Sequence, residues 1–217
     1  DRIRFGPRQE ILTPNENGFA YASASADGSR IAVALAYSDE ARVVCATNPS
    51  DVVTLRKHVG MRTVAISPDG KWVATGTWNG SRLKLWDAQS GAALREFTQL
   101  ESANLAFSPD GRWLLVAGLD YRLLQVPTWE PGPAIALGAQ NLFRGIAAFS
   151  PDGPRIVTAS DDETARSWDT ATGAALVELR GHSNVVRSAA FSPDGSRIVT
   201  TSGDQIARVW DAGASPR

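Results

Sequence analysis

Ser192-Pro193-Asp194-Gly195 is the last of four copies of one tetrapeptide in this chain. The other copies are Ser67–Gly70, Ser108–Gly111 and Ser150–Gly153, and a relaxed copy, Ser-Ala-Asp-Gly, stands at Ser25–Gly28. The serines of successive copies lie 42, 41, 42 and 42 residues apart. A period of roughly 40–45 residues is typical of a four-stranded unit that packs beside its neighbours around an axis. The sequence therefore predicts five such units.

Each copy has the chemistry of a tight turn between two strands. Proline presets φ at the second turn position, aspartate bonds back to the nearby backbone, and glycine accepts a positive φ. Around the last copy, apolar and β-branched residues form three short runs, Val185–Phe191, Arg197–Thr201 and Ile206–Trp210. No stretch has a sustained helical period, and many short strands with evenly spaced turns indicate an all-β fold.

Three Trp-Asp pairs lie in phase with these turns. Trp86-Asp87, Trp168-Asp169 and Trp210-Asp211 each end a repeat, and Gly181-His182 begins one. With the Ser-Pro-Asp-Gly turns, these pairs make the whole chain resemble the WD-repeat β-propeller family, and bacterial-type WD repeats in particular. The resemblance implies an all-β propeller of five four-stranded WD-repeat blades, formed as a single domain by residues 1–217. The successive repeats are expected at residues 14–55, 56–98, 99–138, 139–180 and 181–217.

The spacing also assigns the positions at which a Trp-Asp pair is missing. The tryptophan follows the turn glycine by 15 residues in repeats four and five, and the same count from Gly111 reaches Val126. We therefore expect Val126-Pro127 to hold the Trp-Asp position of repeat three, and Val44-Cys45 that of repeat one. Trp129 then falls in the following loop, where it packs on neighbouring prolines or marks a second contact.

The termini indicate how the last repeat is completed. By the same count, residues 1–13 contain a fourth, outer strand, and the chain ends just after a third strand at Asp211. We expect this N-terminal strand to pair with the last blade and close the ring, because closure removes free sheet edges. Two other arrangements stay open: a fragment of a larger ring, and an incomplete ring that pairs with another chain as an oligomer.

The composition argues against several function classes. With 22 basic and 23 acidic residues the formal net charge is -1, so the chain lacks the basic excess typical of binding to nucleic acid or to an anionic membrane. No apolar run reaches the ~18 residues of a membrane span. The chain opens with Asp1–Arg4 rather than an apolar signal segment, and Cys45 is its one cysteine, which favours a cytoplasmic protein. With two histidines and one cysteine, no metal site and no cofactor are expected.

The family resemblance assigns a buried, hydrogen-bonded tetrad to the last repeat, formed by His182, Thr200, Asp204 and Trp210. Partial copies are expected at His58, Thr75, Asn79 and Trp86, and at Gln140, Thr158, Asp162 and Trp168. A hydroxyl, a histidine and a carboxylate also resemble a catalytic nucleophile, base and acid. The set recurs from repeat to repeat, however, whereas catalysis needs one site. We therefore expect a structural network that satisfies buried polar groups, and no enzymatic activity.

Candidate binding residues are those that depart from the repeat where partners of this family commonly dock. That surface, called the top face below, is formed by the loop after the second strand of each blade and the loop before the first strand. The residues expected there are Arg62, Arg187 and Arg144 at the starts of innermost strands, with Trp78, Asp161 and Tyr37 in the loops. Arginine, tryptophan and tyrosine dominate binding hot spots, so we predict a non-enzymatic scaffold that binds a protein or peptide. The three arginines favour an acidic or phosphorylated segment.

Other readings of these residues remain open. The arginines are equally well explained as solvated or stacked within their own blades. A small-ligand or glycan-binding propeller is a second function class, although no exposed aromatic residue recurs from blade to blade as such sites need. A third is a blade fragment or regulatory module of a larger multidomain protein.

Overall fold

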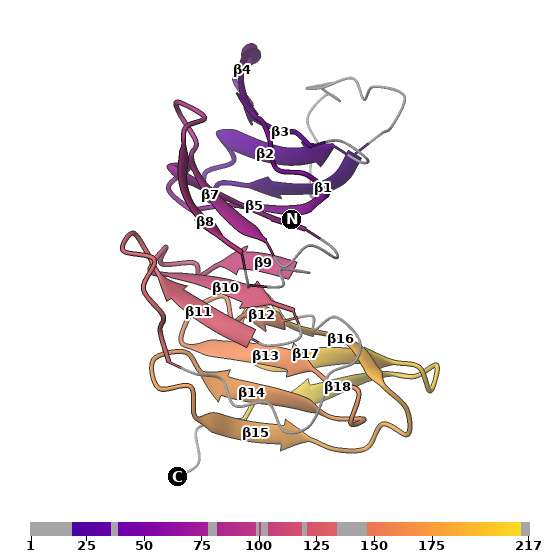
Figure 1. The fold of residues 1–217 in the computed structure, drawn as a ribbon. Coiled ribbons are helices and arrows are strands. Elements are labelled where there is room, and N and C mark those ends of the chain that lie inside the picture. Colours follow the sequence, from indigo (N-terminus) through magenta and orange to yellow (C-terminus); the bar gives the residue numbers. More distant parts are fainter. Residues whose placement is uncertain are drawn as a thin grey trace, which may run out of the picture.

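A computed structural model describes residues 19–35, 39–77, 82–98, 100, 104–118, 121–133 and 147–213 of the chain. Within them the regular structure consists of β-strands, which form five antiparallel sheets (Figure 1). The all-β prediction is therefore confirmed. No helix in this part of the chain has the length and apolarity that a membrane crossing requires.

The strands occur in chain order within each sheet, and each sheet lies within one of the five predicted repeats. Sheet 1 contains β1 (Phe19–Ala24), β2 (Arg30–Leu35), β3 (Ala41–Cys45) and β4 (Asn48–Leu55). Sheet 2 contains β5 (Met61–Ile66), β6 (Trp72–Thr77), β7 (Leu83–Asp87) and β8 (Ala93–Phe97). Sheet 3 contains β9 (Asn104–Phe107), β10 (Trp113–Ala117) and β11 (Tyr121–Gln125). Sheet 4 contains β12 (Ala147–Phe149), β13 (Arg155–Ala159), β14 (Ala165–Asp169) and β15 (Ala175–Leu179), and sheet 5 contains β16 (Val186–Phe191), β17 (Arg197–Ser202) and β18 (Ala207–Asp211).

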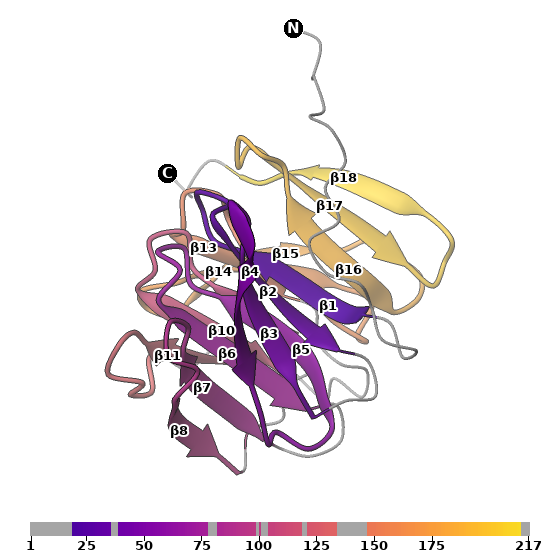
Figure 2. The same cartoon turned by 90° about the horizontal axis from the view of Figure 1, so that it is seen from above.

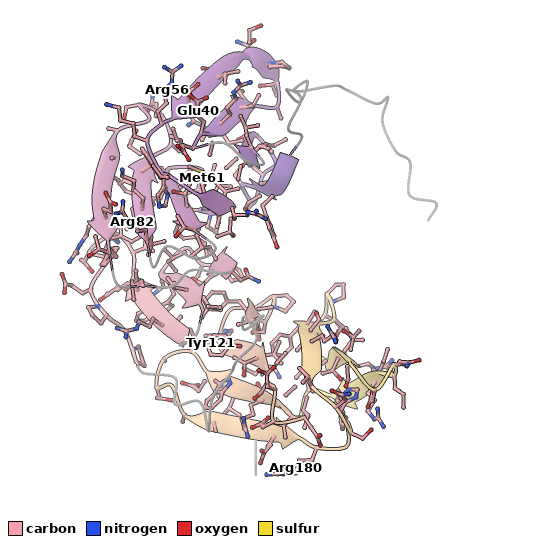
Figure 3. The ribbon with its side chains drawn as sticks, turned by 45° about the vertical axis from the view of Figure 1, so that its right-hand side comes forward. Glu40, Arg56, Met61, Arg82, Tyr121 and Arg180 are labelled. Carbon is pink, nitrogen blue, oxygen red and sulfur yellow. The ribbon has the colours of Figure 1, made fainter. Side chains whose placement is uncertain are left out.

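The sheets follow one another along an arc. Sheets 1, 2 and 4 pack on the next sheet mainly through their first two strands, and sheet 3 mainly through its first strand, β9. Figure 3 shows this arc as an open curve, with sheet 1 at one end and sheet 5 at the other. The described residues form no closed ring. The outer strand predicted within residues 1–13 lies outside the described residues.

The Ser-Pro-Asp-Gly tetrapeptide closes the hairpin between the first and second strands of a sheet. In sheet 2, the Ser67 hydroxyl donates to Asp69 at 2.6 Å and accepts from the Trp72 amide at 2.9 Å. The Gly70 amide donates to the Ser67 carbonyl at 2.9 Å, and Gly70 has a φ of 70°. A positive φ is strained for a residue with a side chain, which explains the glycine in every copy.

The hydrophobic core lies between the sheets rather than inside any one of them. Four described clusters of buried residues each join two neighbouring sheets, in the order 1–2, 2–3, 3–4 and 4–5. A sheet in the middle of the arc therefore buries both faces, as the repeat pattern requires.

The structure corrects the position of the missing tryptophan in repeat three. In sheets 4 and 5, Trp168 lies opposite Ile156 and Trp210 lies opposite Ile198. The residue in the same place in sheet 3 is Leu124, which lies opposite Leu114, so the prediction of Val126-Pro127 is wrong by two residues. The cause is a short loop, since three residues separate the paired ends of β10 and β11, whereas five separate those of β13 and β14. In sheet 1, Val44 lies opposite Ile31, as the spacing predicted.

Trp129 occupies the turn position that glycine holds in other sheets. The amides of Gly91 and Gly173 donate to Asp87 and Asp169, and the Trp129 amide donates to Gln125 in the same way, at 2.6 Å. Trp129 has a φ of 62°, against 72° for both glycines.

The Trp129 side chain joins sheet 3 to sheet 2. It is buried and meets Trp72 edge-on, with ring centroids 5.9 Å apart. The neighbouring backbone is held as well, because Arg95 of β8 donates to the Thr128 carbonyl at 3.3 Å. Trp129 is thus a core residue rather than an exposed second contact.

We predict an unusual order of stability for two variants of Trp129. Replacing it with alanine should lower the free energy of unfolding by about 3 kcal/mol, because a large buried side chain is lost. Trp129→Gly removes one carbon more, yet it should cost about 1 kcal/mol less than Trp129→Ala, because glycine tolerates the positive φ. Urea denaturation of both variants measures the order. A glycine variant less stable than the alanine variant would contradict the assignment.

Candidate functional site

The last repeat contains a continuous chain of hydrogen bonds that joins β17 and β18 to the segment before β16 and to the turn between β17 and β18. The Trp210 indole donates to the Thr200 hydroxyl at 2.8 Å, and that hydroxyl lies 2.7 Å from Nε2 of His182. Nδ1 of His182 lies 2.8 Å from Oδ2 of Asp204. The structure therefore brings together all four residues predicted as a tetrad in this repeat.

The network itself fixes the direction of each bond. The Asp204 carboxylate can only accept, so Nδ1–H of His182 donates to it. In the neutral imidazole, Nε2 then accepts from the Thr200 hydroxyl, which itself accepts from Trp210. Burial by itself raises the pKa of Asp204, but the hydrogen bonds from His182 and from the amides of Ile206 and Ser183 outweigh it and hold that pKa far below its ordinary value. Asp204 is therefore the anion at the end of the chain.

Sheet 2 contains a related but different arrangement. The Trp86 indole donates to Thr75 at 2.8 Å, and Thr75 lies 2.6 Å from Nδ1 of His58 rather than Nε2. Asn79, the predicted fourth member, lies outside the described residues. Burial, followed by the positive charge of Lys84, lowers the pKa of His58 to about 4. His58 is accordingly neutral at physiological pH.

In sheet 4 the tryptophan and the threonine share a hydrogen bond, but the aspartate accepts hydrogen bonds from other residues. The Trp168 indole donates to Thr158 at 2.8 Å. Asp162 instead accepts from Arg166 at 2.6 Å and from the Thr164 hydroxyl at 2.6 Å. Gln140, the residue predicted between them, lies outside the described residues.

The network of sheet 5 has the groups of a catalytic triad, but its hydroxyl is not accessible to a substrate. The Thr200 side chain is fully buried, and Thr75 and Thr158 are as well. A nucleophile must reach its substrate, whereas each of these hydroxyls is occupied by an indole of its own sheet. Among the described residues, no three or more His, Cys, Asp or Glu side chains gather as a metal site would require. The arrangement suits cross-strand fixation.

A basic residue on the third strand belongs to these networks and was missed from the sequence. Arg208 donates to Asp204 at 3.2 Å, and Arg166 binds both Asp162 and Glu178. Lys84 lies 3.4 Å from Glu96, with its ammonium 5.1 Å from the centre of the Trp86 ring. The signal was periodic: a basic residue stands two places before the tryptophan position in every repeat, at Arg42, Lys84, Arg122, Arg166 and Arg208.

Arg62 and Arg187 lie at the same place in two different sheets. In β5, Met61 pairs with Thr77 and Thr63 with Gly76, so Arg62 is the extra residue of a β-bulge. In β16, Val186 pairs with Ser202 and Ser188 with Thr201, so Arg187 is the extra residue there. Bulges often re-aim a side chain at a functional surface. Both arginines thus leave the regular alternation of the innermost strand at its top-face end.

Asp161 lies in the same corner of the top face as Arg187. The Val186 amide of sheet 5 donates to the Ser160 carbonyl of sheet 4 at 3.0 Å, and the two predicted residues directly follow this bonded pair. Burial, with a smaller contribution from the charge of Asp161, raises the pKa of Tyr121. The other predicted residues of this face, Trp78, Arg144 and Tyr37, lie outside the described residues.

Comparison with protein families agrees with the repeats. The model described as "WD domain, G-beta repeat" matches residues 49–87, 141–169 and 173–211. Two of these ranges run from a fourth strand to the Trp-Asp pair of the next sheet, and the two positions without a tryptophan, Val44 and Leu124, lie outside the matched ranges. The chain belongs to the WD-repeat family.

Comparison with solved structures supports the fold alone. The hydrazine synthase of Kuenenia stuttgartiensis superposes on 91% of this chain with a TM-score of 0.72 and 20% sequence identity. The chain spans 59% of that protein's matched chain. No curated protein sequence matches the chain.

We predict that the threonine hydroxyls differ in their contribution to stability. Thr200→Val leaves the Trp210 indole and Nε2 of His182 without a partner, and should lower the free energy of unfolding by about 3 kcal/mol. Thr158→Val orphans only the Trp168 indole among the described contacts and should cost about half as much. Denaturant titration of the two variants, which are matched in shape, checks the ratio. Equal losses would show that the histidine bond adds nothing.

We also predict a pH dependence that originates at His58. The folded protein keeps this histidine neutral down to a pKa of about 4, whereas the unfolded chain binds a proton at the ordinary value of 6.5. Because the unfolded state binds more protons in this window, stability is full above pH 6.5 and falls by about 3 kcal/mol as the pH approaches 4. Urea midpoints measured across this range should decrease for the wild type and change much less for His58→Gln. The same slope in both proteins would contradict the assignment.

Proposed function

We propose that this protein is a non-enzymatic scaffold that binds a protein or peptide segment on its top face. The observation that carries the proposal is the pair of equivalent β-bulges at Arg62 and Arg187. Two sheets that are not adjacent place an arginine at the same non-regular position, and arginine is among the residues that dominate binding hot spots. Membership of the WD-repeat family supports a role of this kind, because such domains generally bind proteins or peptides.

The chemistry of these residues favours an acidic or phosphorylated segment as the partner. A guanidinium presents several donors in a planar fork that matches the oxygens of a carboxylate or phosphate. Arg187 is exposed and lies near the start of β16, at the top-face end of the strand. Asp161 adds one carboxylate to the same corner, so we expect the bound segment to carry a donor next to its acidic group.

The finer architecture of the proposal is a propeller of five blades. Sheets 1, 2 and 4 each have a fourth strand beside the third, whereas β18 of sheet 5 has none among the described residues. We propose that the strand predicted within residues 1–13, from the same chain or from a second copy, supplies this missing neighbour. The top face then extends around the inner strands of all five sheets.

A charge-reversal experiment tests the binding face. The probe is an array of synthetic peptides, each in phosphoserine, glutamate and unmodified serine versions. We expect the wild type to retain phosphorylated or acidic peptides, and the double variant Arg62→Glu/Arg187→Glu to bind them at least tenfold more weakly. The melting temperature of the variant should stay close to that of the wild type, because neither side chain is in the core.

The matched control has the same change in charge elsewhere. Lys71→Glu/Arg112→Glu alters two exposed residues in the Ser-Pro-Asp-Gly turns, at the opposite ends of the strands. It should bind as the wild type does. Equal retention by the wild type and by Arg62→Glu/Arg187→Glu, or equal loss in both double variants, would exclude a specific role for the top-face arginines.

A further inference from the structure

Sheet 5 exposes the face that every other sheet buries against its successor. In sheet 4 this face carries Val157 on β13 and Ser167 on β14, which are 0% and 1% exposed. The same positions in sheet 5 are Val199, 41% exposed, and Val209, 66% exposed. The corresponding residues of sheets 1 to 3 are all buried: Ala32, Ala74 and Leu115 on the second strand, and Val43, Leu85 and Leu123 on the third. Sheet 5 therefore presents an inter-sheet surface with nothing packed on it among the described residues.

An arginine that ties one sheet to the next is also present on this face. Arg155 of sheet 4 donates to the carbonyls of Ala212 at 3.1 Å and Gly195 at 2.8 Å, both in sheet 5. Arg30 of sheet 1 donates in the same way to the Ala88 carbonyl of sheet 2 at 3.1 Å. Arg197 holds this position in sheet 5, where its side chain is exposed.

A depression marks the same place on the surface. It has a volume of about 460 Å³ and is lined by Ser196, Arg197, Val209, Trp210 and Asp211. Figure 2 shows β18 as the outermost strand of sheet 5, at the edge of the molecule. The apolar residues, the arginine and the depression form one continuous surface, which we call the end face of sheet 5.

The first sheet exposes the complementary face. Ala147 and Ala189, on the inner strands of sheets 4 and 5, are buried against the preceding sheet. Ala22 holds this position in sheet 1 and is exposed. The turn glycines show the same difference in exposure. A side-chain carbon placed at Gly195 would touch Arg155 of the preceding sheet, whereas one placed at Gly28 would touch nothing within 4 Å. These residues make up the end face of sheet 1.

We propose that the end face of sheet 5 binds the end face of sheet 1 in a second copy of this chain. By analogy with the sheet 4–5 contact, Val199 and Val209 of one copy cover Ala22 of the other, and Arg197 donates to the carbonyls of Gly28 and Ala46. The partner is a second copy because Figures 1 and 3 place sheets 1 and 5 of one chain at opposite ends of the arc. The contact continues an interface that the chain already forms between its own sheets.

This contact joins two different surfaces, so it has a polarity. Such head-to-tail association closes into a ring if the rotation allows and otherwise extends copy after copy. The outer strand that we propose beside β18 would then come from the same second copy, since it directly precedes sheet 1 in sequence. The top-face arginines take no part in the contact, so this inference and the proposed function can fail separately.

A complementation experiment tests the polarity directly, using the full chain. Val209→Lys blocks the end face of sheet 5, and Ala22→Arg blocks that of sheet 1; both residues are exposed, so both variants should fold. We expect the wild type to sediment as a dimer or larger species. Each variant alone should be a monomer. An equimolar mixture should recover a dimer, and nothing larger, because one intact junction remains between the two variants.

Three outcomes would overturn the inference. A wild type that stays monomeric at high concentration means that sheet 1 of the same chain, or no sheet, covers the end face of sheet 5. A wild-type oligomer that survives both substitutions uses some other surface. A mixture that stays monomeric, although each single variant has lost assembly, excludes head-to-tail contact. The melting temperatures of the two variants, compared with the wild type, exclude misfolding as the cause.

Discussion

The structure depends on one constraint, which is that each sheet has two apolar faces and can bury them only against other sheets. Val157 illustrates it: the residue is fully buried because sheet 5 lies on it, whereas Val199, its counterpart one sheet later, is 41% exposed. The buried clusters accordingly sit at the junctions. Stability in such an array is the sum of sheets and junctions. The two ends of the arc are therefore its weakest points and the places where association is most favourable.

Within a sheet, the threonine hydroxyl is the second organising interaction. In sheets 2, 4 and 5 it accepts an indole N–H from the third strand, which ties two strands together through a buried polar contact. Sheet 3 has Leu124 in place of the tryptophan and lacks this tie. It gains a different one, since Trp129 packs against Trp72 of sheet 2. The missing contact within the sheet is thus offset by an added contact between sheets.

The sequence predicted the fold because the turns and the Trp-Asp pairs recur in phase, and local chemistry explains each of them. It failed where a loop length broke the period. The loop between β10 and β11 is two residues shorter than the loop between β13 and β14, so the spacing taken from the other repeats predicted Val126 where Leu124 lies. Trp129 was misjudged for a related reason: nothing in the sequence shows that a tryptophan takes the positive φ of a turn glycine. The tetrad of the last repeat was predictable because the resemblance to the WD-repeat family assigns its members to these positions. Its basic neighbour, Arg208, was equally periodic but had no known role to draw attention to it.

The two surfaces proposed for interaction differ in physical character, and this difference follows from the way the repeat is built. The side chains of a strand alternate between the two faces of its sheet, so each repeat presents the same two faces. These faces favour contact with another sheet of the same kind. The top face lies where strands end, and a bulge frees one side chain from that alternation, as at Arg62 and Arg187. Residues at strand ends and in loops can vary without loss of the fold. Recognition of other molecules is therefore best placed at the top face, and recognition of further copies at the ends of the arc.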